Sequence, residues 1–352
     1  MNRRQRQESG FILATTLWIV AAVAVLAALF HAYIERQVNE AAALQQRVRD
    51  NFAVEATAET LRYLLATRRV TFAGVTLRLE DQGGYISPEG FIDSSPVGGE
   101  LRLDGTVYQG LGGVRFSIHD LAGQLGLNSP SGPDWMREIL TRQLGRQQAL
   151  ELVAALEDYI DENRTRRING AEAARYQMAG RDEPTNWYLR TTTELENVWG
   201  WKALLDSEWG GFWKTNAGVA FSSVVNLNTA SPELLSALLY IDEAEAQALI
   251  AARNEYPFRS LKGVADALGS TDSRWQEASF RFYPGGDLSF RLWCESCNWI
   301  SVESLQKTEN GFYGPWLMYH RYRAPRELGN EQDEPAALVP GNLFADPLPP
   351  DQ

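Results

Sequence analysis

A long apolar segment near the N-terminus constrains this chain more than any other feature. Between Phe11 and Phe30 the only polar side chains are Thr15 and Thr16. A helix of this length, at about 1.5 Å per residue, crosses a hydrocarbon core of about 30 Å. Three arginines precede the segment, and Glu35 is the first charged residue after it. This charge order predicts a cytoplasmic N-terminus and an exported body.

Three interpretations of the segment compete. One is a permanent signal anchor. Another is a cleaved signal peptide, but its apolar core is normally about 7–15 residues long, and Phe30-His31-Ala32 is a poor cleavage site. The third follows from the basic leader that ends in Gly10 directly before Phe11. This order resembles the class III leader of type IV pilins and pseudopilins, in which a membrane peptidase cleaves between Gly and Phe and methylates the new amine. The resemblance implies cleavage after Gly10, and the membrane helix stays with the mature protein.

One position departs from the pilin pattern. Pilins of that family usually carry a glutamate as the fifth mature residue, and Thr15 occupies that position here. A carboxylate in a bilayer is costly unless it is paired, and in the family it faces the amine of the adjacent subunit nearer the tip. A subunit with no neighbour above it gains nothing from that charge. Thr15 therefore suggests a position at the filament tip.

Composition limits the remaining possibilities. The 352 residues are 44% hydrophobic, enough to bury a core in two domains after the membrane helix. A net charge of -12 argues against a nucleic-acid partner, because phosphate-binding surfaces are usually basic. The two cysteines, Cys294 and Cys297, are too few for a zinc site of four thiolates. In an exported body we predict a disulfide between them, with a redox pair or two free thiols as alternatives.

Apolar spacing predicts that one helix runs from about Phe11 to Arg68, on the order of 85 Å at the standard rise. A coiled-coil stalk is the alternative, but the spacing is not a strict heptad. Strand patterns follow at 70–72 and 75–79, with a turn at 81–84 and alternation again over 107–118. We therefore expect the second half of the helix to pack on an antiparallel meander, as in pilins.

Helical patterns then occupy about 160 residues from Asp120 onward, and strand patterns return at 279–283, 288–293, 299–302 and 316–322. The predicted fold class is α+β, with a long N-terminal helix on an antiparallel sheet and a large inserted all-α domain. The expected segments are a leader over 1–10, a transmembrane helix over 11–34, the first part of a pilin-like domain over 35–120, the insert over 121–280, returning strands over 281–325 and a disordered acidic tail over 326–352.

The best local signature lies inside the insert and covers 225–235, 248–253 and 256–261. It resembles the helix-hairpin-helix unit of competence-type DNA receptors and also the inserted domain of general secretion pathway protein K, a minor pseudopilin of type II secretion. DNA-binding hairpins use a Gly-x-Gly turn whose bare amides approach a phosphate. The corresponding stretch here, 240–244, has two acids and no glycine. We interpret the unit as a packing module.

Further stretches favour the protein K family. Residues 117–128 contain a D-x-x-G-x-x-x-x-N pattern at the start of the insert, 158–176 resemble the acidic loop of that family, and 193–200 resemble its next helix. Each motif alone is moderately specific, but their order is more so. Together with the leader they cover most of residues 8–300.

The acidic loop is the one candidate metal site. Its hard oxygen ligands suit calcium, which the resemblance places in the inserted domain. The candidate ligands are Asp158, Asp161, Asn163 and Glu172, with Glu162 and Asp182 nearby. The alternative is a solvated helix end whose acids are offset by Arg164, Arg166 and Arg167.

No set of residues predicts catalysis, so we do not expect an enzyme. The histidines His31, His119 and His320 are far apart in the sequence, and combinations with Ser and Asp mean little without geometry. The resemblance implies assembly instead: a single-pass inner-membrane protein with a periplasmic body. Its implied partners are other minor pseudopilins in a tip complex, the major pseudopilin, prepilin peptidase and the inner-membrane secretion platform. The alternatives are an anchored DNA-uptake receptor and, less favoured, an anchored periplasmic enzyme.

Overall fold

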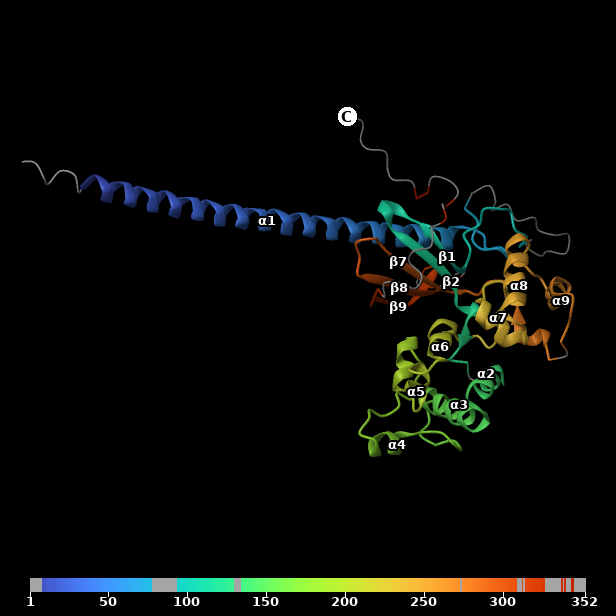
Figure 1. The fold of residues 1–352 in the computed structure, drawn as a ribbon. Helices are drawn as coiled ribbons and strands as arrows, with labels where there is room; N and C mark the ends of the chain where they lie inside the picture. Colours follow the sequence, from blue (N-terminus) through green and yellow to red (C-terminus); the bar gives the residue numbers. More distant parts are fainter. Residues whose placement is uncertain are drawn as a thin grey trace, which may run out of the picture. The chain divides into compact units, whose positions relative to one another are not determined.

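The computed structural model describes residues 8–77, 94–129, 134–272, 274–308 and 314–326, together with residues 312, 337, 339, 343 and 344. The chain divides into two compact units, Met1–Ala53 and Val54–Gln352. The boundary falls within helix α1, which spans Glu8–Thr67 (Figure 1).

The described part of the first unit is helical, and its stretch from 11 to 34 is strongly apolar. Among the described residues, α1 is the single helix long and apolar enough to cross a membrane, with a mean hydropathy of 2.5 in its most apolar window. Leu13 and Trp18 are 73% and 76% exposed. A helix with exposed large apolar side chains and no charge over this stretch fits a single-pass membrane anchor. The prediction of one helix from about Phe11 to Arg68 is confirmed.

The second unit contains a five-stranded antiparallel sheet in the order β1-β2-β7-β8-β9. Its strands are β1 (Asp104–Gln109), β2 (Arg115–Asp120), β7 (Asp287–Trp293), β8 (Trp299–Lys307) and β9 (Trp316–Pro325). Alternate side chains point to opposite faces. Phe116 lies opposite Leu292 on a buried apolar face, whereas His119 lies opposite Ser289 on a polar face.

The last turns of α1 pack on the sheet. Leu61 and Leu64 are buried, and a buried ion pair of 2.6 Å joins Arg62 Nη2 to Glu303 Oε2 on β8. The backbone N–H of Leu111 donates to the Thr57 hydroxyl at 3.2 Å. Leu111 belongs to the short helix η2 (Leu111–Gly113) in the β1–β2 connection. The fold class predicted from the sequence, a long helix on an antiparallel sheet with further helices, is confirmed.

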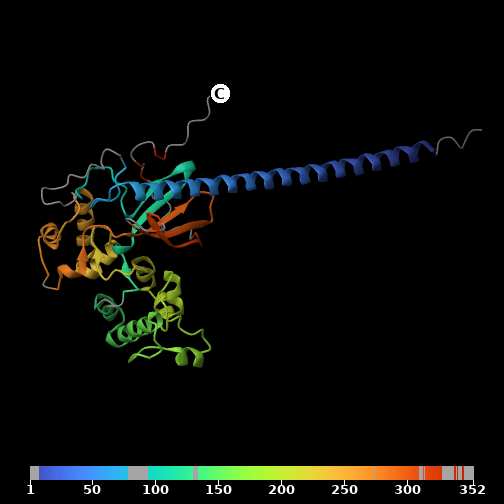
Figure 2. The same cartoon turned by 180° about the vertical axis from the view of Figure 1, so that it is seen from behind.

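The insert leaves the sheet after β2 and returns at β7, and these two strands are hydrogen-bonded neighbours. It contains the following elements, seen from two sides in Figures 1 and 2: η3 (Leu121–Gly123), β3 (Leu125–Gly126), α2 (Asp134–Leu144), α3 (Arg146–Ile160), α4 (Ala173–Met178), η4 (Thr192–Asn197), α5 (Trp201–Leu205), α6 (Gly210–Asn216), β4 (Ala217–Gly218), β5 (Val225–Asn226), α7 (Pro232–Leu239), α8 (Glu243–Glu255), α9 (Leu261–Leu268), η5 (Glu277–Ser279) and β6 (Phe280–Arg281). Trp201 and Trp213, both fully buried, meet edge to face at 5.2 Å in its core.

Two strand expectations need correction. The strand expected at 279–283 does not join the main sheet, because β6 pairs in parallel with β5 inside the insert. Within the described part of the 70–79 pattern, residues 70–77, the backbone forms isolated bridges, Val70 with Val75 and Val75 with Leu101, in place of regular strands. A sequence shows that a segment suits extended backbone, but the partner strand is chosen by tertiary packing. The turn expected at 81–84 lies outside the described residues.

Most of the tail expected to be disordered, 326–352, also lies outside the described residues. Two of its described positions contact the sheet. Ala337 exchanges hydrogen bonds with Val107 and Gln109 beside β1, at 2.9 and 3.1 Å. Phe344 is 9% exposed, and its ring centre lies 5.1 Å from that of Phe116. At these positions the chain packs on the sheet, because an apolar ring and a free strand edge offset the cost of ordering it.

Candidate functional site

The start of the insert is fixed by a buried carboxylate. Asp120, the last residue of β2, is 2% exposed. It accepts hydrogen bonds from Asn226 Nδ2 at 2.8 Å, Thr229 Oγ1 at 3.1 Å and the backbone N–H groups of Ala122 and Gly285, both at 3.0 Å. Burial raises the pKa of Asp120, although these four donors oppose the shift. One side chain thus ties the sheet to both ends of the insert.

The other residues of the D-x-x-G-x-x-x-x-N pattern belong to the same junction. At Gly123 a Cβ would lie 2.6 Å from the Thr229 hydroxyl, so no larger residue fits. The Asn128 amide donates to the carbonyls of Leu189 and Val219, each at 2.8 Å, and accepts from the Leu189 N–H at 2.9 Å. These hydrogen bonds are between protein groups, so the pattern marks a structural junction.

The acidic loop after α3 is built around a second buried carboxylate. Asp158 is 0% exposed. Its Oδ1 accepts from Arg167 Nη1 at 3.0 Å, and the Arg167 backbone N–H lies 3.2 Å from both carboxylate oxygens. Gly170 packs directly on this group, because a Cβ there would meet Oδ2 at 2.0 Å. A buried carboxylate needs such partners, since unpaired charge is costly away from water.

The next residues direct side-chain oxygens back onto the loop. Asp161, at the C-cap of α3, accepts from the Asn163 N–H at 3.1 Å through Oδ1, while its Oδ2 contacts Arg167 Nη1. Asn163 Oδ1 accepts from the Thr165 N–H at 2.7 Å. The loop therefore presents carboxylate and amide oxygens, the hard ligands that calcium prefers.

Glu172 provides the clearest sign of an unmet interaction. It caps α4, and its Oε2 accepts from the Ala173 N–H at 3.3 Å. The residue is 6% exposed, yet Oε1 is buried and has no hydrogen-bond partner among the described residues. Burial raises the pKa of Glu172, and the negative charges of Asp158 and Asp161 raise it further. A buried carboxylate oxygen without a donor is a place where proteins hold an ion or water.

The donor set therefore fits calcium in its chemistry, with one cation of the chain already among the acids. Arg167 contacts Asp158 and Asp161. In the described structure, the carboxylates of these two residues and of Glu172 do not all lie within 4.8 Å of one another. Glu162 and Asp182 are exposed. The sequence predicts a calcium site on this loop, but it did not show that Arg167 and Gly170 contact Asp158.

The helix-hairpin-helix-like unit consists of α7, α8 and α9. Ser231 caps α7 by accepting from the Leu234 N–H at 3.1 Å. At the start of α8, Asp242 accepts from the Glu245 N–H at 2.8 Å, and the Glu245 carboxylate accepts from the Asp242 N–H at 2.9 Å. In a DNA-binding hairpin, backbone amides at this turn would bind a phosphate. Here the amides of the capping box donate to the carboxylates of Asp242 and Glu245 instead.

The turn of that unit is closed by an aromatic residue. Tyr240 adopts a left-handed backbone with φ of 60°, where DNA-binding hairpins have glycine. Two guanidinium groups approach its ring, with the Cζ atoms of Arg142 and Arg274 at 4.6 and 3.5 Å from the ring centre. On α8, the buried Arg253 donates to the carbonyls of Leu227 and Ala230 at 2.8 and 2.7 Å. These contacts hold the unit together as a packing module.

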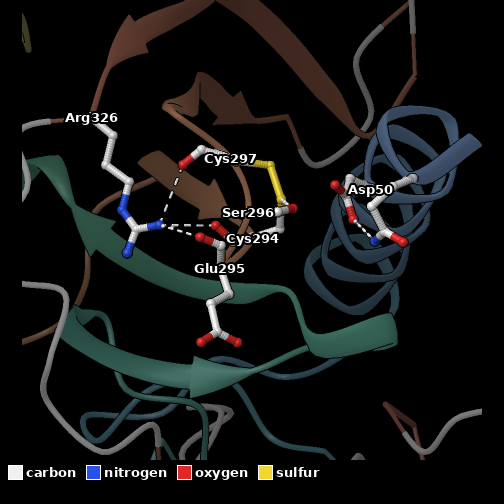
Figure 3. The surroundings of a disulfide bond; sticks show 7 residues. Asp50, Cys294, Glu295, Ser296, Cys297 and Arg326 are labelled. Carbon is white, nitrogen blue, oxygen red and sulfur yellow. Dashed lines mark hydrogen bonds between the residues drawn. A yellow bond between two sulfur atoms is a disulfide. The ribbon is translucent and has the colours of Figure 1, made fainter. Parts of the chain in front are cut away.

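The two cysteines are bonded to each other in the turn between β7 and β8 (Figure 3). From the end of β9, one Nη1 of Arg326 donates to the carbonyls of Cys294, Glu295 and Cys297 at 3.0, 3.2 and 3.3 Å. Figure 3 shows this guanidinium pointing into the turn. The disulfide and Arg326 together fix the turn, a structural role.

The predicted cleavage site, Gly10-Phe11, falls within α1. The Thr15 hydroxyl donates to the Ile12 carbonyl at 2.9 Å. Thr15 can therefore lie in an apolar environment, because its hydroxyl is paired within the helix.

Comparison with known proteins gives two findings. Residues 225–279 match the family model of the type II secretion system (T2SS), protein K. The fold is similar to a chain in the crystal structure of the GspK-GspI-GspJ complex from the type 2 secretion system of enterotoxigenic Escherichia coli, with a TM-score of 0.54, 13% identity, and coverage of 82% of this chain and 100% of that chain. No curated protein matches. The match in the insert and the shared fold both support the protein K resemblance found in the sequence.

Proposed function

We propose that this chain is a minor pseudopilin at the tip of the periplasmic pseudopilus, where it initiates and caps the filament. The observation that carries the proposal is the protein K match at 225–279, located in a helical insert between neighbouring strands of a pilin-like sheet. The anchor supports membrane assembly, and the insert adds bulk that a subunit stacked inside a filament would have to accommodate. Its role is assembly for protein export, not catalysis.

The proposed partners are other minor pseudopilins in the tip complex, with the major pseudopilin below them. The similar solved structure is a complex of GspK with GspI and GspJ. The inner-membrane secretion platform would supply the assembly machinery, with the N-terminus cytoplasmic and the second unit periplasmic. Co-expression of the full chain with two minor pseudopilins of its own secretion system tests this: all three should co-elute after detergent extraction. Separate elution at micromolar concentration would contradict the tip complex.

Processing at Gly10-Phe11 is part of the proposal. Prepilin peptidase would cleave between these residues and methylate Phe11. Mass spectrometry of the mature chain should find methylated Phe11 at its start. A Gly10→Val variant is the matched control, because a branched side chain at the cleaved bond should leave the leader in place. Wild-type chain that keeps Met1 in the presence of the peptidase would rule this processing out.

We further propose that the acidic loop binds calcium through Asp158, Asp161, Asn163 and Glu172. The support is the hard-oxygen donor set and the buried, unpartnered Oε1 of Glu172. When bound, the ion would neutralise the clustered carboxylates and order the loop. Calorimetry on the full chain in detergent should detect calcium binding that Glu172→Gln weakens at least tenfold, with magnesium as the control ion. The absence of both calcium heat and thermal stabilisation would remove this proposal.

A further inference from the structure

One guanidinium lies among the acids of the 158–172 loop. Arg167 Nη1 is 3.0 Å from Asp158 Oδ1 and also contacts Asp161 Oδ2, while Nε is 3.2 Å from Glu157 Oε2. A single side chain thus binds three carboxylates from the end of α3. Two of these carboxylates, those of Asp158 and Asp161, are proposed ligands of the divalent cation.

The hold of Arg167 on these acids is incomplete. Its side chain is 40% exposed, whereas that of Asp158 is 0% exposed. The acid is therefore fixed in the loop, but the guanidinium can move into water at modest cost. The single charge of Arg167 is shared among the carboxylates of Glu157, Asp158 and Asp161, and Glu172 Oε1 receives no donor among the described residues.

These contacts describe the loop with Arg167 paired to its acids. We infer that Arg167 is a tethered competitor of the divalent cation, occupying the carboxylates of Asp158 and Asp161 until calcium displaces it. The inference rests on the calcium site proposed above. In the arginine-paired state the guanidinium keeps the loop folded without metal. In the calcium-bound state the ion takes the carboxylates, gains Glu172, and releases the Arg167 side chain to solvent.

The consequence is a lowered apparent affinity for calcium. When the competent state is populated only in part, the apparent dissociation constant rises by the inverse of that fraction. If the arginine-paired state holds about nine tenths of the molecules, removing the competitor strengthens calcium binding about tenfold. The loop would then bind calcium at higher calcium concentrations than it would if Arg167 did not compete for the ligands.

The test compares variants of the full chain in detergent by calorimetry with calcium chloride. Arg167→Gln should bind calcium at least tenfold more tightly than wild type. Arg166→Gln is the matched control, since it removes the same charge one residue away and takes part in no ion pair among the described residues; it should stay within about threefold of wild type. In thermal melts without calcium, Arg167→Gln should unfold below wild type, and calcium should remove the difference.

Three outcomes overturn the inference. Calcium binding by Arg167→Gln that matches the Arg166→Gln control would show that Arg167 does not compete, while leaving the calcium site standing. Binding by none of the chains would remove the calcium site and the inference with it. If Arg167→Gln does not fold, Arg167→Lys serves instead, because a single ammonium cannot reproduce the planar fork; less than a threefold gain in its calcium affinity would also overturn the inference.

Discussion

At the scale of single residues, the second unit depends on a buried charge shared between the helix and the sheet. Glu303 on β8 is 0% exposed and lies 2.6 Å from Arg62 Nη2 of α1 and 2.8 Å from Arg321 Nε of β9. Buried ion pairs add little net stability over apolar residues, but breaking one leaves a charge without a partner. The ion pair between Arg62 and Glu303 therefore fixes the position at which α1 packs on the sheet.

Removing the carboxylate charge should expose that dependence. Glu303→Gln removes the buried carboxylate partner of Arg62, whose other partners, Glu59 and Glu55, are exposed. We therefore expect the free energy of unfolding to fall by about 3 kcal/mol in chemical denaturation. Asp266→Asn is the control, because its ion pair with Lys262 is exposed on both sides and exposed pairs contribute about 1 kcal/mol or less. Equal effects of the two substitutions would contradict this account of Glu303.

His119 predicts a dependence of stability on pH. Burial, and next the positive charge of Arg291, lower the pKa of His119 to about 3, while Asp104 opposes the shift. An unfolded histidine protonates near about 6.5, so below that pH the unfolded state binds more protons than the folded state. Stability should therefore fall as pH drops from about 6.5 toward 3, by on the order of 1 kcal/mol per pH unit.

Denaturation of the full chain at several pH values between 7 and 5 measures this slope. His119→Gln should flatten it, because glutamine does not titrate. His31→Gln replaces an exposed imidazole in the first unit and should leave the slope of the second unit unchanged. An unaltered slope in His119→Gln would exclude His119 as its source.

At the scale of elements, the junction between sheet and insert is more demanding than its short sequence pattern indicates. Asp120 accepts four hydrogen bonds. Three of the donors, Asn226, Thr229 and Gly285, follow it in the sequence by 106, 109 and 165 positions. Asp120→Ala leaves these donors buried without an acceptor, and we expect a loss of about 2–4 kcal/mol in the free energy of unfolding. Asp120→Asn keeps one acceptor oxygen and should lose less. A smaller effect of alanine than of asparagine would refute this ranking.

Two interactions hold the β7–β8 turn: the disulfide, which is covalent, and the hydrogen bonds from Arg326. The disulfide closes a very short loop, so the chain-entropy contribution is about 2 kcal/mol. Cys294→Ser with Cys297→Ser should therefore lower the melting temperature modestly and leave the fold intact, since Arg326 still holds three carbonyls of the turn. Adding Arg326→Ala should cost more in this background than in wild type. Strict additivity of the two changes would argue against shared support.

At the scale of the whole molecule, the insert begins and ends at neighbouring strands of the sheet, although its side chains also contact the sheet. It leaves from Asp120 and returns at Asp287, and Asp120 pairs with Leu288 across neighbouring antiparallel strands. A short turn could therefore join β2 to β7 without moving the sheet. The sheet would keep its apolar face on α1, while the matched protein K segment would be absent.

Replacing residues 121–286 by a short glycine-containing turn tests the proposed capping role. Membrane insertion and helix packing should persist, because α1 and the five strands are retained, whereas pseudopilus initiation should fail or filament length should change. Filament length by electron microscopy is the measurement, with the variant's abundance in the membrane as the control. Normal assembly and normal length would speak against a capping role of the insert.

Local order was predictable where side-chain periodicity and capping residues suffice. The helix from Phe11 onward, the start of α7 at Ser231-Pro232 and the β1–β2 alternation follow from neighbouring residues alone. The acidic loop was also found, because carboxylates close in sequence remain close in space. Pairing was less predictable: β6 joins β5 in the insert, and Phe344 packs on Phe116.

By itself, therefore, the sequence determined the apolar helix, the α+β class and the order of the motifs, and cleavage between Gly10 and Phe11 stays a prediction. Those features depend on composition and on residues a few positions apart. Only the tertiary structure decided that Arg167 lies among the acids, that Glu172 Oε1 lacks a donor and that Asp120 joins both ends of the insert. The physical reason is that burial and charge pairing depend on residues far apart in the chain, whose approach is set by packing of the whole unit.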